Sequence, residues 1–249
     1  MQGLRLFRCS GITVRLHVSW FPALLLLTWS LATDIFPDLL PELVGPPAFV
    51  LGFCGALLFF VCLLLHEAGH CLISLRCGIP VRSITLSCIG GVAEIAHEPQ
   101  RPRDEIRIAL AGPAVSLVLG LLFLAFAFLF ESREALLPAL LSAWVGWANL
   151  FLLLFNLLPG YPLDGGRVLR AMLWARSGEP ESATRVSSRI GSFFGLAIAG
   201  YGLWSLIFLG QPQGTGPVLV GLFLRHAAQK STRRISPMGD CNFRPPSPE

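Results

Sequence analysis

The sequence has little charge. Only 14% of its 249 residues are charged, whereas 53% are hydrophobic, and about a quarter of the residues of a soluble globular domain carry a charge. Lysine is nearly absent, since Lys230 is the only one, and the formal net charge of +4 is therefore carried almost wholly by arginine. This shortage of charge argues against a soluble globular enzyme and indicates a chain that contacts lipid.

Paired cysteine motifs are also absent. The seven cysteines are an odd number at irregular spacings, and none forms a CxxC pair. Neither a disulfide framework nor a zinc ribbon is indicated. Cys54 and Cys62 lie in an apolar run, where a thiol usually behaves as a small hydrophobic side chain. We therefore interpret the cysteines as structural residues.

Long apolar runs, in contrast, are abundant. A helix needs about 20 apolar residues to cross the hydrocarbon layer of a bilayer. Five segments approach this length: 17–36, 48–75, 106–130, 136–158 and 190–210. A sixth segment, 217–228, is short. We predict an all-α polytopic membrane protein with about six transmembrane helices.

The first apolar segment has an alternative interpretation. Arginines precede it, and Ser30-Leu31-Ala32 resembles the cleavage site of a signal peptide. The apolar stretch is long for that role, however, and a soluble mature domain is not expected after it. We therefore favour a retained membrane span.

The positions of the basic residues predict the orientation. With the N-terminus in the cytoplasm and six crossings, every basic residue except Arg133 falls on the cytoplasmic side. This is the positive-inside bias of membrane proteins, and it accounts for the basic balance without nucleic acid as a partner. It also supports the short sixth span, because without it the basic tail would lie outside. Both termini are expected in the cytoplasm.

Two segments differ from the apolar spans. Between the second and third spans, apolar residues partly alternate around Gly90 and Gly91, which predicts a small β-hairpin. The end of the chain is rich in proline, serine and arginine and is predicted to be a disordered cytoplasmic tail. We therefore expect an integral-membrane domain over residues 1–228 and a tail over 229–249.

The second span carries a motif that indicates metal binding and catalysis. Residues 66–70 read His-Glu-Ala-Gly-His, which is HExxH. On a helix, His66 and His70 point to one side and can bind one zinc ion, while Glu67 is suited to act as general base. Ionisable residues are costly in hydrocarbon and are functional candidates there. The alternative is that the helix ends here and its polar residues only reach interfacial water. That would explain why the residues are polar, but not why the histidines are four residues apart.

A third zinc ligand is expected, because catalytic zinc usually has three protein ligands and one open position. The fourth span runs in the same direction as the second, and it ends in the sequence NLLPGYPLDGG at residues 156–166. Its prolines and glycines break the helix, which is tolerated where the backbone lines a watered cavity. Asp164 is therefore predicted to be the third ligand. The alternative is that Asp164 only caps the following stretch, 165–176.

HEAGH at 66–70 together with FNLLPGYPLDGGR at 155–167 closely resembles the site-2 proteases, a family of intramembrane zinc metalloproteases. The resemblance implies that Zn²⁺ is bound by His66, His70 and the Asp164 of an N-x-x-P-x-x-x-x-D-G motif. It also implies that Asn156 helps to orient or stabilise the reacting carbonyl. Ala111-Gly112-Pro113 and the glycine hairpin extend the resemblance over most of residues 10–210.

The same resemblance implies an activity and a partner. The expected reaction is hydrolysis of peptide bonds in or near the membrane spans of tethered proteins, commonly regulators such as anti-sigma factors. Glu67 is expected to be catalytic, with Asn156 contacting the substrate by resemblance. Gly90 and Gly91 are expected to bind the substrate for a separate reason, because the edge of their hairpin can take up an added strand. The chain resembles the simpler bacterial and archaeal members without a PDZ domain, in the bacterial inner membrane, and the residues after Ala228 are too few for a CBS domain.

Two other classes of function stay open at this point. Polar residues in broken membrane helices also form the ion sites of transporters and channels. A catalytically silent membrane scaffold would keep the same fold. The sequence indicates neither the substrate nor the oligomeric state.

Overall fold

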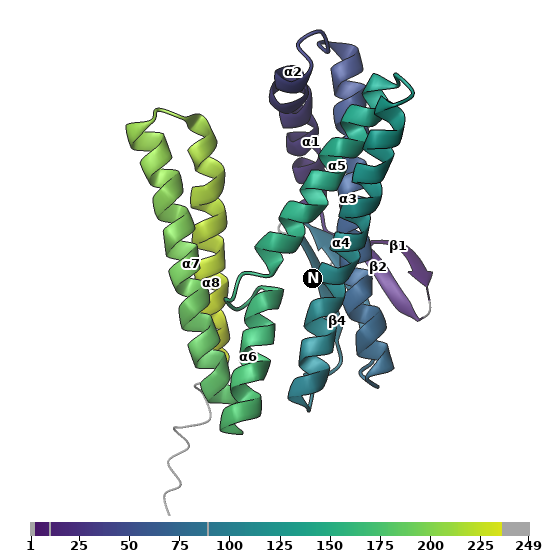
Figure 1. Cartoon of the computed structure of the whole chain (residues 1–249). Coiled ribbons are helices and arrows are strands. Elements are labelled where there is room, and N and C mark those ends of the chain that lie inside the picture. Colours follow the sequence, from purple (N-terminus) through teal and green to yellow (C-terminus); the bar gives the residue numbers. More distant parts are fainter. Residues whose placement is uncertain (1–2, 10, 89, 236–249) are drawn as a thin grey trace, which may run out of the picture. The chain divides into compact units, whose positions relative to one another are not determined.

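The computed structural model describes residues 3–9, 11–88 and 90–235 (Figure 1). The chain divides into two compact units, Met1–Asn156 and Leu157–Glu249. The first unit contains a small sheet and most of the apolar helices. The second is made of helices in the part that the structure describes.

The first unit is built around one long helix. This helix, α3 (Pro46–Arg76), begins with prolines, which suit the first helical turn because its N–H groups have no partner within the helix. Helix α4 (Pro102–Glu131) begins in the same way and packs against both α3 and α5 (Leu136–Asn156). A continuous apolar segment precedes them: α1 (Trp20–Ser30), the π-helical turn η1 (Leu31–Ile35) and α2 (Phe36–Leu39).

The sheet of this unit has four strands in the order β1-β2-β3-β4. They are β1 (Leu4–Cys9), β2 (Ile12–Leu16), β3 (Val81–Ser87) and β4 (Gly90–Ile95). The antiparallel pair β3–β4 confirms the hairpin predicted between the second and third spans. The N-terminal hairpin β1–β2 was not predicted, and β2 joins β3 in parallel.

The core of the first unit joins the sheet to the helices. One cluster of buried side chains combines Trp20, Leu31 and Phe36 with Phe60 of α3 and Leu86 of β3. A second cluster, formed by Cys71, Val81 and Ile84, packs β3 against the C-terminal part of α3. These contacts hold the β3–β4 hairpin beside the helix segment that carries the histidine pair.

The second unit consists of α6 (Asp164–Ser177), α7 (Pro180–Phe208), the 3₁₀ turn η2 (Pro212–Gly214) and α8 (Thr215–Ile235). Helix α7 packs against both α6 and α8. Because α8 continues to Ile235, residues 229–235 of the predicted disordered tail are helical. The rest of that tail lies outside the described residues.

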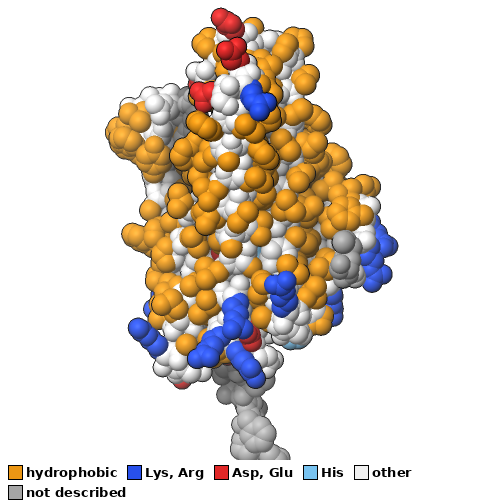
Figure 2. Space-filling view, turned by 45° about the vertical axis from the view of Figure 1, so that its right-hand side comes forward, with side chains coloured by type: hydrophobic (Ala, Val, Ile, Leu, Met, Phe, Trp, Pro, Cys, Tyr) orange, Lys and Arg blue, Asp and Glu red, His pale blue; other side chains and the backbone are white. Residues whose placement is uncertain are grey.

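Five apolar segments are long enough to cross a membrane: Trp20–Leu39, Pro46–Arg76, Pro102–Glu131, Leu136–Asn156 and Pro180–Phe208. They confirm the five long spans predicted from the sequence. Hydrophobic side chains cover most of the face in Figure 2, a surface that lipid tails would contact without cost. Helix α8 contains the predicted sixth segment but is not among the five, so the sixth crossing stays a prediction.

Candidate metal centre

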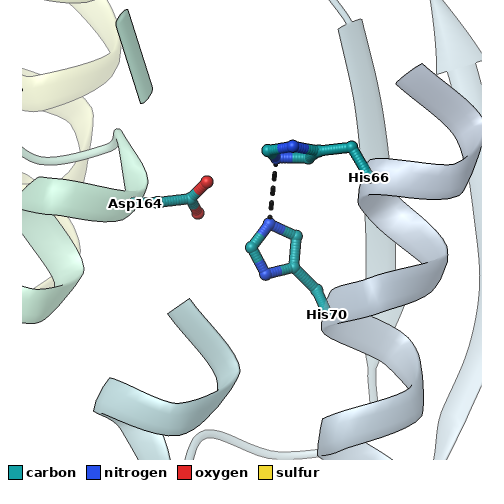
Figure 3. Close-up of side chains that lie close together, drawn as sticks. All are labelled: His66, His70 and Asp164. Atoms are coloured by element: carbon teal, nitrogen blue, oxygen red, sulfur yellow. Dashed lines mark hydrogen bonds between the residues drawn. The ribbon is translucent and has the colours of Figure 1, made fainter. Parts of the chain in front are cut away.

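The histidine pair lies in the C-terminal half of α3. His66 and His70 are one helical turn apart and both are buried. Their Nε2 atoms lie 3.2 Å from each other (Figure 3). Two nitrogens that bind a tetrahedral zinc ion at 2.0–2.1 Å are separated by about 3.3 Å. The spacing of the two nitrogens therefore fits a single zinc ion.

The other nitrogen of each ring contacts α4. His70 Nδ1 lies 2.7 Å from the carbonyl oxygen of Ile108, and His66 Nδ1 lies 2.8 Å from Ser116 Oγ. A carbonyl oxygen can only accept a hydrogen bond, so His70 Nδ1 donates its N–H to Ile108. In the neutral ring Nε2 then carries the lone pair, which is the form that binds a metal.

The backbone of α4 leaves space in front of the two rings. A Cβ atom added to Gly112 would lie 2.2 Å from His70 Nε2 and 2.6 Å from His66 Nε2. Both distances are too short for a Cβ atom, so any other residue here would displace the two imidazole rings from these positions. A second glycine, Gly69 of α3, lets the helices approach, because a Cβ atom there would lie 2.9 Å from the Ala111 carbonyl oxygen. From the sequence alone, Gly112 was identified only as part of the segment Ala111-Gly112-Pro113, which resembles the site-2 proteases.

Glu67 lies against the sheet. A Cβ atom on Gly91 of β4 would come 2.2 Å from Glu67 Cγ and 3.1 Å from its Oε1, so the carboxylate side chain lies directly over the backbone of this strand. Gly90 has a different part in the hairpin. It adopts φ +126°, a conformation that side chains rarely permit, and its carbonyl accepts a hydrogen bond from Ser87 Oγ at 3.1 Å.

Asn156 is the last residue of α5. Its Nδ2 donates a hydrogen bond to the Leu152 carbonyl of the same helix at 3.0 Å. The amide is half-buried. Its expected contact with a substrate carbonyl stays a prediction.

Asp164 is the buried first residue of α6 in the second unit. The N-cap position belongs to Leu163, so the structure does not support the alternative that Asp164 serves as the cap. The two glycines after Asp164 are required by close packing. A Cβ atom on Gly165 would lie 2.1 Å from the Leu157 carbonyl oxygen, and one on Gly166 would lie 2.1 Å from the Gly160 carbonyl carbon. The preceding loop therefore folds back onto the start of α6.

Among the described residues, one group of side chains could hold a metal ion. It consists of His66, His70 and Asp164, all buried, with one ligand atom of each within 4.8 Å of the others (Figure 3). Two imidazoles and one carboxylate form a donor set of catalytic zinc sites, in which a fourth position stays open.

Known proteins that resemble this chain fit both features described above, the long apolar helices and the candidate metal ligands. The model of peptidase family M50 matches residues 54–141 and 132–198. The chain belongs to this family, which includes the site-2 proteases. The site-2 protease from Methanocaldococcus jannaschii has a similar structure, with a TM-score of 0.63 and 28% sequence identity over 93% of this chain and 96% of that chain.

Curated relatives resemble nearly the whole chain. The putative zinc metalloprotease Rip3 of Mycobacterium tuberculosis is 39% identical over 240 residues, which cover 94% of this chain and 60% of the relative. The putative zinc metalloprotease sll0528 of Synechocystis is 37% identical over 236 residues, which cover 93% of this chain and 60% of that relative. The chain thus spans about 60% of the length of these relatives.

Proposed function

We propose that this protein is an intramembrane zinc metalloprotease that hydrolyses peptide bonds in or near the membrane spans of other proteins. The observation that carries the proposal is the pair of buried Nε2 atoms, 3.2 Å apart on a helix long and apolar enough to cross a membrane. The relatives Rip3 and sll0528, both named as putative zinc metalloproteases, support the activity.

In this proposal His66, His70 and Asp164 hold the zinc ion. Neutral imidazole nitrogen and carboxylate oxygen suit zinc, whereas Ca²⁺ and Mg²⁺ prefer oxygen ligands alone. The space that Gly112 leaves in front of both histidines supports the same assignment. When bound, zinc polarises a peptide carbonyl and lowers the pKa of water at the open position.

Glu67 is the proposed general base and acid. It stands between the two histidines in the sequence, and its side chain is half-buried. Its carboxylate accepts a proton from the attacking water and later delivers that proton to the nitrogen of the leaving amine. Contact with the Gly91 backbone limits the positions that this carboxylate can take.

Strand β4 is the proposed binding element for the substrate. A helical substrate uses its carbonyls in its own hydrogen bonds and has to unwind locally before water can attack. In the sheet that the structure describes, β4 is an edge strand, and an edge can accept an extended peptide as an added strand. Because Gly91 lies beside Glu67, a peptide bound along Gly90 and Gly91 would come close to the catalytic carboxylate. Asn156 would orient the reacting carbonyl.

The proposed setting is the inner membrane of a bacterium, with both termini and the water path to the site on the cytoplasmic side. The positive-inside distribution of arginine supports this orientation. The proposed substrates are membrane-tethered regulatory proteins.

The test compares full-length wild-type protein with Glu67→Gln and Asp164→Ala in detergent or liposomes. Glu67→Gln should keep the zinc content of the wild type and lose cleavage, because the amide cannot accept the proton. Asp164→Ala should lose zinc, because one of three ligands is missing. Zinc is measured by mass spectrometry of the metal, and cleavage by comparing membrane-protein fragments in cells that express each form.

Glu131→Gln, at the far end of α4, is the matched control and should behave as the wild type. Normal cleavage by Glu67→Gln would contradict the mechanism, and unchanged zinc in Asp164→Ala would remove Asp164 from the site. Zinc uptake into proteoliposomes without proteolysis would favour a transporter, and no chelator-sensitive cleavage at all would favour a silent scaffold.

A further inference from the structure

Ser116 lies on the far side of the His66 ring from His70. Its side chain is fully buried in α4, and its Oγ lies 2.8 Å from His66 Nδ1. We propose that Ser116 is a positioning residue, which holds the His66 imidazole in the orientation that binds zinc and accepts its Nδ1–H when Nε2 binds the metal. The inference rests on the proposed role of His66 as a ligand.

The contacts of α4 with the two histidines follow one stripe of the helix. Ile108, Gly112 and Ser116 are spaced by four residues, so they lie on the same face of α4. Ile108 contacts His70 through its carbonyl, Gly112 leaves room for both Nε2 atoms, and Ser116 contacts His66. The stripe therefore supplies one hydrogen-bond partner for each ring and an open space between them.

The Ile108 carbonyl and the Ser116 hydroxyl differ in the histidine tautomers that they permit. The Ile108 carbonyl only accepts, and so it permits a single neutral tautomer of His70. The Ser116 hydroxyl can donate or accept. His66 binds zinc through Nε2 only when its proton is on Nδ1, and then Ser116 Oγ has to accept that N–H. Without the hydroxyl, the buried Nδ1–H would lose this partner, which disfavours the tautomer that binds the metal.

A hydrogen bond to the outer nitrogen of a ligating histidine typically affects metal affinity by about 10- to 100-fold. We therefore expect Ser116→Ala to weaken zinc binding by a factor in this range. Thr at this position keeps the hydroxyl, whereas Val has nearly the same shape without it. Ser116→Thr should retain most of the affinity, and Ser116→Val should lose it.

The experiment uses the full chain in detergent. Zinc affinity is measured by competition with a chromophoric chelator, and the geometry of the site by the visible absorption of Co²⁺ bound in place of zinc. Ser116→Ala and Ser116→Val should show weaker binding and a changed cobalt spectrum, and Ser116→Thr should restore both. If the alanine variant does not fold, the Thr and Val pair still isolates the hydroxyl.

Ser74→Ala is the matched control. Ser74 is buried in α3, and its Oγ donates to the His70 backbone carbonyl at 2.9 Å rather than to an imidazole ring. It should keep the affinity of the wild type. Unchanged zinc affinity and cobalt spectrum in Ser116→Ala, or an equal loss in Ser74→Ala, would overturn the role of Ser116.

His66→Ala separates this inference from the proposed function. If His66→Ala still binds zinc as the wild type does, the assignment of His66 as a ligand is wrong. If His66→Ala loses zinc while Ser116→Ala does not, only the role of Ser116 fails.

Discussion

At the scale of single residues, the two histidines depend on different kinds of partner. His70 donates to the backbone carbonyl of Ile108, which a side-chain substitution does not remove, whereas His66 is bonded to the Ser116 hydroxyl, which one substitution deletes. The orientation of His66 is therefore the more sensitive of the two to mutation. The same face of α4 carries Gly112, whose missing side chain leaves space in front of both Nε2 atoms.

Gly112→Ala should abolish stoichiometric zinc binding. Its Cβ atom would lie 2.2 Å and 2.6 Å from the two Nε2 atoms, which is closer than a van der Waals contact, so the methyl group would fill the space in front of both lone pairs. Metal analysis of the purified protein checks this. Gly200→Ala, at a site where a Cβ atom meets nothing within 4 Å, is the control. Full zinc content in Gly112→Ala would contradict the geometry.

At the scale of elements, close helix pairs in this protein depend on glycine. Helices α7 and α8 approach so closely that a Cβ atom on Gly202 would lie 2.7 Å from Val218 N of α8, and also 2.6 Å from the Gly214 carbonyl oxygen of the preceding turn η2. Small residues are typical of helix contacts in membranes, where close van der Waals packing replaces the hydrophobic effect. The α7–α8 pair is thus a packed hairpin whose separation is set by backbone atoms.

Gly202→Ala should destabilise this hairpin by about 1–3 kcal/mol, the usual cost of overpacking. Gly200→Ala lies on the same helix two residues earlier and has open space, so it should be neutral or slightly stabilising, since alanine favours helix over glycine by up to about 1 kcal/mol. Thermal unfolding in detergent, followed by circular dichroism, compares the two. Equal stability of both variants would refute the close α7–α8 contact.

At the scale of the whole molecule, the distribution of charge and apolar length defines a polytopic membrane protein. Five segments are long and apolar enough to cross a bilayer. With five crossings the two termini would lie on opposite sides, and with six on the same side. The basic residues from the middle of α8 onward, among them Arg225 and Lys230, favour the cytoplasm and hence the sixth crossing.

Reporter fusions test the topology. A reporter that is active only outside the cytoplasm should be active when placed between Glu131 and Leu136, and inactive when placed after Arg103 or after residue 235. The positive-inside rule is the physical reason for all three outcomes. An active fusion after residue 235, with the other two as expected, would show that α8 does not cross.

Much of this protein was predictable from local sequence. The five spans follow from apolar length, which needs no knowledge of packing. The HExxH ligand pair follows from the helical period. The parallel pairing of β2 with β3 was not predicted because the two strands lie more than 60 residues apart in the chain, and no local pattern reports such a pairing. The arginines of β1 and β2, which are Arg5, Arg8 and Arg15, were interpreted as signals of topology or of a signal peptide and not as parts of strands.

By itself the sequence determined the membrane class, the family resemblance and the two histidines on one helix face, because each depends on composition or on spacing within one segment. Only the tertiary structure decided which atoms surround those histidines. Ser116, the Ile108 carbonyl and the bare Gly112 belong to another helix, and their contact with α3 depends on the register in which the two helices pack. That register is set by side-chain shape across the contact, and no periodicity within either helix encodes it.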